Sequence, residues 1–227
     1  MREDPSHSEA AYNLVWNLLS TGYFEEALAI AERFVELDPL SARAHSQLAQ
    51  ALISNGRLSE AITSFEIGDQ LGMPFDSYFL GIAYLLEEQD EIAIDHLESF
   101  LRKQGQPDEW VRGLVVGARD PESGQAHLDR VILRYEDEAA GSRGEEFYFA
   151  FKFLDRFFEI IFEIGLTGVE WSPAEGLVFT ATILRQSGFT ADPRYLEWAE
   201  ADGLFELWDE RGAPDHCEKL DGQWVCE

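Results

Sequence analysis

The two cysteines of this 227-residue chain lie near its end, on either side of a strong turn signal. Asp221-Gly222 favours a two-residue hairpin because both positions tolerate a positive φ angle. Pairing residues outward from this turn places Cys217 opposite Cys226 at a non-hydrogen-bonded position, where Cα atoms lie about 4.5 Å apart. A disulfide requires a separation of this kind, so the spacing predicts a bond between Cys217 and Cys226.

Two other states of these cysteines remain open at this point. A reducing compartment would leave both thiols free, whereas a disulfide indicates an oxidising one. A zinc site that adds His216 is disfavoured, because a structural zinc ion needs four ligands and only three candidates lie near one another. We therefore predict no metal at this end of the chain.

The remaining residues form no catalytic pattern. The sequence has no HExxH, no glycine-rich phosphate loop and no GxSxG elbow. Neighbouring acids such as Glu87 and Glu88 point in different directions on a helix and do not make a catalytic pair. The histidines are scattered along the chain, at His7, His45, His96, His127 and His216. We predict that the chain is not an enzyme and needs no cofactor.

A short pattern that recurs three times accounts for most of the first hundred residues. Its small residues Ala27, Ala61 and Ala93 are 34 and 32 residues apart, which is the spacing of stacked helix pairs. Apolar residues at intervals of three and four indicate helices, and Gly22 and Gly56 end the first helix of their pairs. Each alanine is expected where two helix backbones approach closely.

Over roughly residues 8–105 this pattern resembles the tetratricopeptide repeat. The positions that carry the resemblance are Leu14, Ala27, Pro39, Leu48, Ala49, Ala61, Phe65, Leu80, Gly81, Tyr84 and Ala93. The resemblance implies an all-α fold, an α-solenoid of helix-turn-helix pairs, with repeats at 8–41, 42–74 and 75–105.

Beyond the third repeat the sequence predicts further helices. Residues 107–138 are expected to form a divergent pair, which extends the solenoid to 6–140. The run Gly141-Ser142-Arg143-Gly144 predicts a joint. Residues 145–227 are then expected to form a helical part packed on the solenoid. That part begins with a strongly aromatic helix over 145–164, which must be covered on most sides.

The end of the chain resembles a second group of proteins. Segments 187–196, 203–208 and 212–217 are similar to the tail of the tetratricopeptide regions that follow winged-helix DNA-binding domains or adenylate cyclase domains in bacterial signalling proteins. This resemblance implies a regulatory interaction module of bacterial signalling. It supplies no catalytic residues.

The composition is strongly acidic and argues against nucleic-acid binding. The chain has 44 acidic against 17 basic residues and a formal net charge of -27, which repels phosphate backbones. The acids either form a solvated surface or attract a basic partner. The sequence contains no stretch of 18 uncharged apolar residues, so it does not predict a membrane span. We expect a cytoplasmic protein if the chain is complete, and a periplasmic one if it is an excised domain with the disulfide.

The first helix of each repeat is expected to line a concave groove that binds a partner. The residues that we expect to contact the partner are Tyr12, Trp16, Arg43, Gln50, Phe75, Tyr78 and Ile82. They are largely aromatic and apolar, which favours an apolar or basic protein segment held by aromatic anchors. The alternative is that the chain's own C-terminal helices fill the groove.

Two functions are compatible with these observations. The chain is expected to be a non-enzymatic adaptor or sensor whose groove binds a protein segment. Alternatively, its aromatic C-terminal part encloses a small ligand and the repeats relay the change. The sequence predicts neither the identity of the partner nor the oligomeric state.

Overall fold

The structure, a computed structural model, describes residues 5–73, 76–103, 111–112, 115, 190, 193–201 and 203–227. They belong to two compact units, one made of Met1–Glu88 with Ser172–Glu227 and the other of Gln89–Trp171. The predicted joint at 141–144 and the predicted aromatic helix at 145–164 lie outside the described residues.

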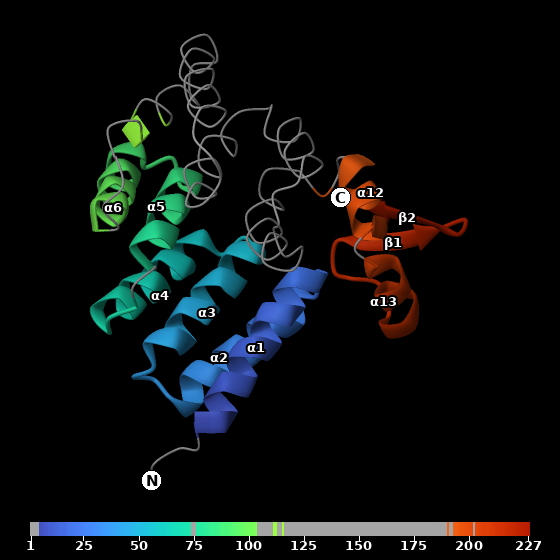
Figure 1. The fold of residues 1–227 in the computed structure, drawn as a ribbon, viewed down its shortest axis with the longest axis horizontal. Helices are drawn as coiled ribbons and strands as arrows, with labels where there is room; N and C mark the ends of the chain where they lie inside the picture. Colours follow the sequence, from blue (N-terminus) through green and yellow to red (C-terminus); the bar gives the residue numbers. More distant parts are fainter. Residues whose placement is uncertain are drawn as a thin grey trace, which may run out of the picture. The chain divides into compact units, whose positions relative to one another are not determined.

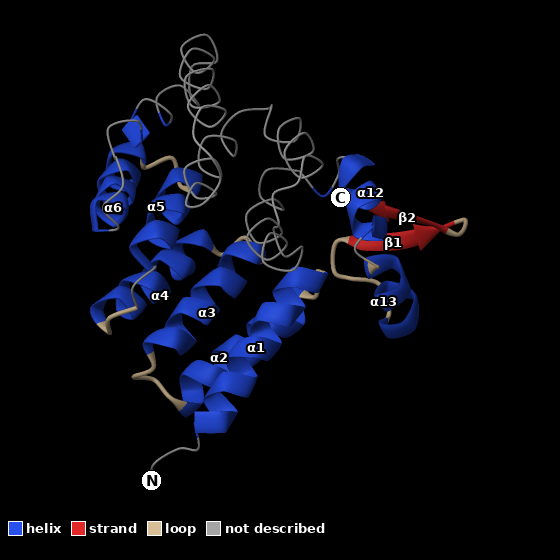
Figure 2. Cartoon of the chain, in the orientation of Figure 1, coloured by secondary structure: helices blue, strands red, loops and turns tan. Residues whose placement is uncertain are grey.

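Most of the described residues are helical, as the sequence predicts (Figure 1). The elements of the first unit are α1 (Pro5–Thr21), α2 (Phe24–Leu37), α3 (Ala42–Ser54), α4 (Leu58–Gln70), α5 (Asp76–Leu86), α12 (Pro193–Ala201), α13 (Leu204–Arg211), β1 (Cys217–Leu220) and β2 (Gln223–Cys226). Consecutive helices from α1 to α5 pack against one another. The predicted stacking of helix pairs is thereby confirmed for α1 to α4, and so is the small hairpin of β1 and β2 (Figure 2).

The same turn geometry recurs in successive helix pairs. Gly22 and Gly56 follow α1 and α3 with φ angles of 90° and 73°, a conformation that glycine adopts without a steric penalty. The Tyr23 amide donates to the Leu18 carbonyl at 3.0 Å. In the next pair the Arg57 amide donates to the Leu52 carbonyl at 2.9 Å. Glu88 holds the corresponding position after α5 with a φ of 60°, although a side chain there costs roughly 1 kcal/mol.

Apolar side chains form the core between α3, α4 and α5. The buried residues of this cluster are Ala49, Leu52, Ile53, Ala61, Phe65, Leu80 and Ala83. Phe65 is fully buried and stacks on Phe79, with ring centroids 5.5 Å apart. Ala61 is fully buried as well, as expected where helices approach closely. Burying one such phenylalanine contributes about 1.5–3 kcal/mol.

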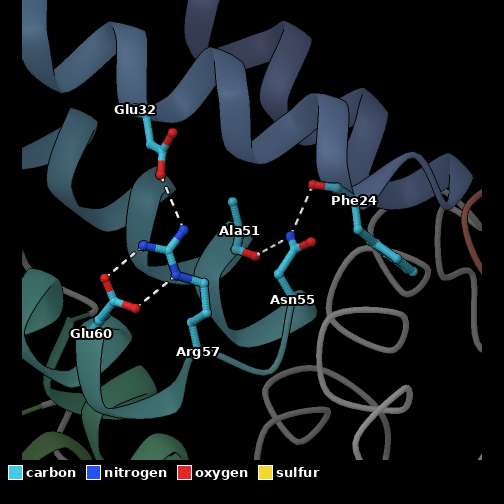
Figure 3. A network of polar contacts seen from close by, with 6 residues as sticks. All are labelled: Phe24, Glu32, Ala51, Asn55, Arg57 and Glu60. Atoms are coloured by element: carbon cyan, nitrogen blue, oxygen red, sulfur yellow. Dashed lines mark hydrogen bonds and ion pairs between the residues drawn. The ribbon is translucent and has the colours of Figure 1, made fainter.

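Polar contacts join neighbouring pairs at the ends of helices. Asn55, which follows α3, donates from Nδ2 to the carbonyls of Phe24 at 2.9 Å and Ala51 at 2.8 Å (Figure 3). One side chain therefore closes α3 and also binds the first residue of α2. At the other end of α3, the Ser41 hydroxyl accepts a bond from the Ala44 amide at 3.2 Å, an ordinary N-cap.

Arg57, which directly precedes α4, links α2 and α4 on the surface of the same region. Its guanidinium donates to both carboxylate oxygens of Glu60, at 2.7 and 2.6 Å, and to Glu32 at 3.2 Å (Figure 3). These hydrogen bonds lower the pKa of the Glu60 carboxyl. All three side chains are largely exposed, so solvent screens the ion pairs and they add little to stability.

The C-terminal module, residues 193–201 and 203–227, combines α12 and α13 with the hairpin. The strands pair antiparallel from Cys217 opposite Cys226 to Leu220 opposite Gln223, which is the predicted register. Asp221 and Gly222 both have positive φ angles, 50° and 84°, so the turn is of type I′. A disulfide joins Cys217 and Cys226. Closing so short a loop removes denatured-state entropy equivalent to roughly 2–3 kcal/mol.

The described part of the second unit is small. It contains α6 (Asp90–Lys103), whose buried face includes Leu97 and Phe100. The Arg112 guanidinium donates to Glu91 at 2.9 Å, and this bond lowers the pKa of the Glu91 carboxyl. Most of the predicted pair at 107–138 lies outside the described residues.

Candidate functional site

Three of the residues expected to bind a partner come together on α1 and α3. The rings of Tyr12 and Trp16 stack with centroids 6.3 Å apart and an interplanar angle of 15°. The Arg43 guanidinium carbon lies 4.7 Å from the centroid of the Tyr12 ring, within the range of a cation–π contact. Tyr12 and Trp16 are partly exposed and Arg43 is exposed. We refer to these three residues as the aromatic–arginine cluster.

Local structure explains how this cluster forms. Tyr12 and Trp16 are four residues apart on α1, so their side chains lie on one face of the helix. Arg43 is the second residue of α3, and the Ser41 cap fixes the start of that helix. Since α1 and α3 pack against each other, the first turn of α3 carries Arg43 to the Tyr12 ring. The result is an apolar surface with one cation.

Of the other expected contact residues, only Gln50 has a described side chain, and it does not extend this surface. Gln50 is only 5% exposed, and Ser46 and Ile53 on the same helix are 1% exposed. A partner therefore has no access to these α3 side chains in this structure. Tyr78 and Ile82 are part of α5, but their side chains lie outside the described set, as does the whole of Phe75.

A second arrangement of side chains, which the sequence did not predict, surrounds the turn between α1 and α2. The Trp208 indole nitrogen donates to the Thr21 carbonyl at 3.0 Å. The Tyr23 hydroxyl donates to the Gly212 carbonyl at 2.8 Å, and the Arg211 guanidinium carbon lies 4.3 Å from the centroid of the Tyr23 ring. The turn between α1 and α2 thus binds the C-terminal module. We refer to this set of contacts as the docking contact.

Asp215 adds a helix cap to the docking contact. α2 begins without a side-chain cap of its own, since Tyr23 at the N-cap position makes no such bond. The Glu25 amide instead donates to the Asp215 carboxylate at 2.7 Å, and the Asp215 amide donates to the Gly22 carbonyl at 3.2 Å. A carboxylate at a helix N-terminus also interacts favourably with the helix dipole.

His216 fills the space beneath this turn. Its ring stacks on Phe24 with centroids 5.1 Å apart, and its Nε2 lies 2.8 Å from the Tyr195 hydroxyl. A Cβ atom at Gly22 would lie 2.7 Å from His216 Cε1 and 2.9 Å from Pro214 Cβ. Glycine is therefore required at position 22 both for its φ angle and for this close approach.

Burial also changes the acidity of two tyrosines in this region. It raises the pKa of Tyr195 well above its ordinary value of 10. Burial raises the pKa of Tyr23 as well, while the Arg211 guanidinium partly opposes the increase and Glu26 and Asp215 add to it. Both hydroxyls therefore keep their protons at neutral pH. They act as hydrogen-bonding groups and not as bases.

The cysteines and His216 lie close enough together to suggest a set of metal ligands. One ligand atom from each of His216, Cys217 and Cys226 lies within 4.8 Å of the others. The two sulfur atoms are bonded to each other in the disulfide, so neither is a thiolate that can bind a metal. In this state the residues do not form a zinc site.

The signals for the docking contact are present in the sequence but not specific. A glycine at position 22 is already explained by the end of α1, so it does not indicate a second contact there. Asp215 and His216 stand between a proline and a cysteine with no periodic pattern. Nothing in the sequence pairs either of them with residues near position 22.

Among the described helices, none is long and apolar enough to cross a membrane.

Comparison with known proteins agrees with the helix pairs. No curated protein shows a significant match to the chain. A family model described as "Tetratricopeptide repeat" matches residues 12–70, which include most of α1 and all of α2, α3 and α4. The similarity of the tail to bacterial regulatory regions remains a prediction. The stacked helix pairs, the repeated turns and this match together show that residues 12–70 are tetratricopeptide repeats.

Proposed function

We propose that this chain is a non-enzymatic interaction module that binds an apolar segment of a partner protein at the aromatic–arginine cluster. Tetratricopeptide repeats generally mediate protein–protein interaction. The observation that carries the proposal is the partly exposed pair of stacked rings on α1 with the Arg43 cation beside it. Aromatic and arginine side chains are the commonest energetic anchors of protein interfaces.

The chemistry of the cluster limits the kind of segment that it binds. Two rings held in register present a large apolar area at little entropic cost. Arg43 supplies one cation, whereas the chain as a whole carries a net charge of -27. Basic residues that flank an apolar segment would therefore be attracted over long range. We expect an apolar segment with basic flanks and not an acidic one.

A displayed library of random peptides supplies the probe. Peptides are selected on the wild-type chain, and their dissociation constants are measured for Trp16→Ala and Arg43→Ala. We expect Trp16→Ala to weaken binding about tenfold or more, because truncating a central anchor costs more than about 1.4 kcal/mol. Leu40→Ala is the matched control, since Leu40 is 79% exposed and lies in the turn after α2. It should change the affinity by less than about twofold.

Folding is checked separately, because Trp16 is partly buried. Circular dichroism should show unchanged helical content in both variants. Peptides that bind Trp16→Ala as tightly as the wild type would show that the cluster is not the binding site. The alternative is a small ligand enclosed by the aromatic C-terminal part, residues 145–227, most of which lies outside the described set.

A further inference from the structure

We infer that the Cys217–Cys226 disulfide is a redox-sensitive latch that holds the C-terminal module on the turn between α1 and α2. The inference concerns the docking contact and does not depend on the proposed function. It rests on the position of the disulfide, directly after the segment that makes most of the docking bonds.

Residues 212–216 form that segment. The Gly212 carbonyl accepts a hydrogen bond from the Tyr23 hydroxyl, and the Asp215 carboxylate caps α2. The His216 ring stacks on the Phe24 ring. Cys217 is the next residue, and it is also the first residue of β1. The position of the docking segment therefore depends on where the hairpin begins, at Cys217.

Hydrogen bonds connect the docking segment to both strands. The Cys217 amide donates to the Pro214 carbonyl at 3.2 Å, and the Glu227 amide donates to the His216 carbonyl at 2.9 Å. The second bond requires β2 to stay paired with β1. Each strand has only four residues, and a two-stranded hairpin of this size is marginally stable in water by itself; here the Trp224 ring of β2 also packs against Trp208, with centroids 5.2 Å apart. The covalent link between the ends of the strands adds to this packing and holds the His216 carbonyl and the Glu227 amide together.

The two cysteines differ in exposure. Cys217 is 9% exposed, whereas Cys226 is partly exposed, so we expect a reductant to attack from the Cys226 side. A thiolate of a dithiol reductant attacks the Cys226 sulfur, forms a mixed disulfide and releases Cys217 as a thiolate. The second thiol of the reductant then displaces Cys226 and leaves as a cyclic disulfide. Two electrons pass from the dithiol to the two cysteine sulfurs, which each take up a proton.

Reduction frees the ends of the strands from each other and so weakens the docking segment. Hydrogen exchange at the Glu25 amide measures this weakening directly. This amide lies in the first turn of α2, where no carbonyl of the helix itself is available as an acceptor, and it donates to Asp215. When the module undocks, this amide loses its acceptor and becomes open to exchange with solvent. The latch thus couples the redox state at the end of the chain to the first repeat.

Amide hydrogen exchange of the full chain tests the inference. The chain is compared before and after treatment with dithiothreitol, and mass measurement counts the two added hydrogens. We expect exchange at Glu25 and Asp215 to accelerate about tenfold or more on reduction, as in local opening. The Phe65 amide in the middle of α4 should change by less than about twofold, because the repeats stay folded.

Two aspartate variants separate the latch from a general effect of reduction. Asp215→Ala removes the acceptor of the Glu25 amide, so exchange there should be fast in both redox states. Asp209→Ala is the matched control, because Asp209 is an exposed acid that pairs with Lys219 within the module. It should keep the full redox dependence. A Cys217→Ser/Cys226→Ser double variant should resemble the reduced wild type.

Three results would overturn the inference. The first is equal exchange at Glu25 in the oxidised and reduced chains. The second is an equal acceleration at Phe65, which would make the disulfide a global staple and not a local latch. The third is a disulfide that dithiothreitol cannot reduce in the folded chain. If the serine variant does not fold, the reduced wild type still gives the decisive measurement.

Discussion

The interface between α3 and α4 and the docking contact hold the same unit together by different means. Between α3 and α4, fully buried residues such as Ala49, Ala61 and Phe65 fill most of the space, and the buried Ser64 hydroxyl donates across it to the His45 carbonyl at 3.0 Å. At the docking contact, an indole, a phenol and a carboxylate each bind one particular backbone group. The first interface is mainly apolar, whereas the second relies mainly on directional bonds.

This difference has consequences for stability and for control. Apolar burial adds up over many atoms and has no preferred direction. A directional hydrogen bond requires its partner in one place, and a buried polar group without its partner is costly. We therefore expect substitutions between α3 and α4 to lower stability through lost apolar burial, and substitutions at the docking contact to depend on exact geometry.

The largest expected effect tests the apolar side of this comparison. Phe65→Ala removes a fully buried ring that stacks on Phe79 and leaves a cavity, so unfolding should require about 3–5 kcal/mol less free energy. Urea denaturation followed by circular dichroism measures the loss. Thr63→Ala, at an exposed position of the same helix, should change the stability by no more than about 0.5 kcal/mol. Equal effects of both substitutions would mean that this core does not dominate stability.

An intermediate effect tests the close approach at the docking contact. Gly22→Ala introduces a Cβ that overlaps His216 and Pro214, in addition to the cost of a positive φ. Gly72→Ala carries the φ cost alone: its φ is 92°, and no atom of the described chain lies within 4 Å of the added Cβ. We expect about 1 kcal/mol for Gly72→Ala and about 1–3 kcal/mol more for Gly22→Ala.

The two glycine variants are compared by urea denaturation under the same conditions. Exchange at the Glu25 amide should also accelerate in Gly22→Ala and stay unchanged in Gly72→Ala. Equal losses of stability in the two variants would show that the turn does not need the close approach to His216.

The smallest effect concerns a single hydrogen bond and its pH dependence. Tyr23→Phe removes the bond to the Gly212 carbonyl and should cost about 1 kcal/mol at neutral pH. Because the pKa of Tyr23 is higher in the folded chain than its ordinary value of 10, the unfolded chain releases this proton first. The stabilisation is therefore complete below about pH 10 and is lost as the pH rises through the folded-state pKa.

Urea midpoints of the wild type and Tyr23→Phe across the alkaline range check this sign. The wild type should lose stability more steeply than the variant above about pH 10, so the two curves approach each other. Parallel curves would mean that Tyr23 does not titrate differently in the folded and unfolded chains.

Much of the repeat region could be predicted from the sequence, because the relevant interactions are local and periodic. The alanine spacing, the apolar period and Gly56 each report on residues within one or two helices. The hairpin register followed from Asp221-Gly222 for the same reason, since turn geometry fixes which residues face each other. The cluster of Tyr12 and Trp16 depended on a helical spacing of four, and only the contact of Arg43 with Tyr12 needed a second helix.

The docking contact could not be predicted in this way. Thr21 and Trp208 are 187 residues apart, and a backbone carbonyl at a helix end accepts a bond from any donor that reaches it. The burial of Gln50 is equally a property of the assembled chain, because its position on the helix marked it as a surface residue.

By itself, the sequence determined the helix pairs, their turns and the pairing of the two strands, because short-range geometry and side-chain periodicity decide these features. Only the tertiary structure decided that the end of the chain caps α2, encloses Gly22 and binds Tyr23. Such contacts depend on where distant segments meet in space, and directional bonds to the backbone leave no periodic pattern in the sequence.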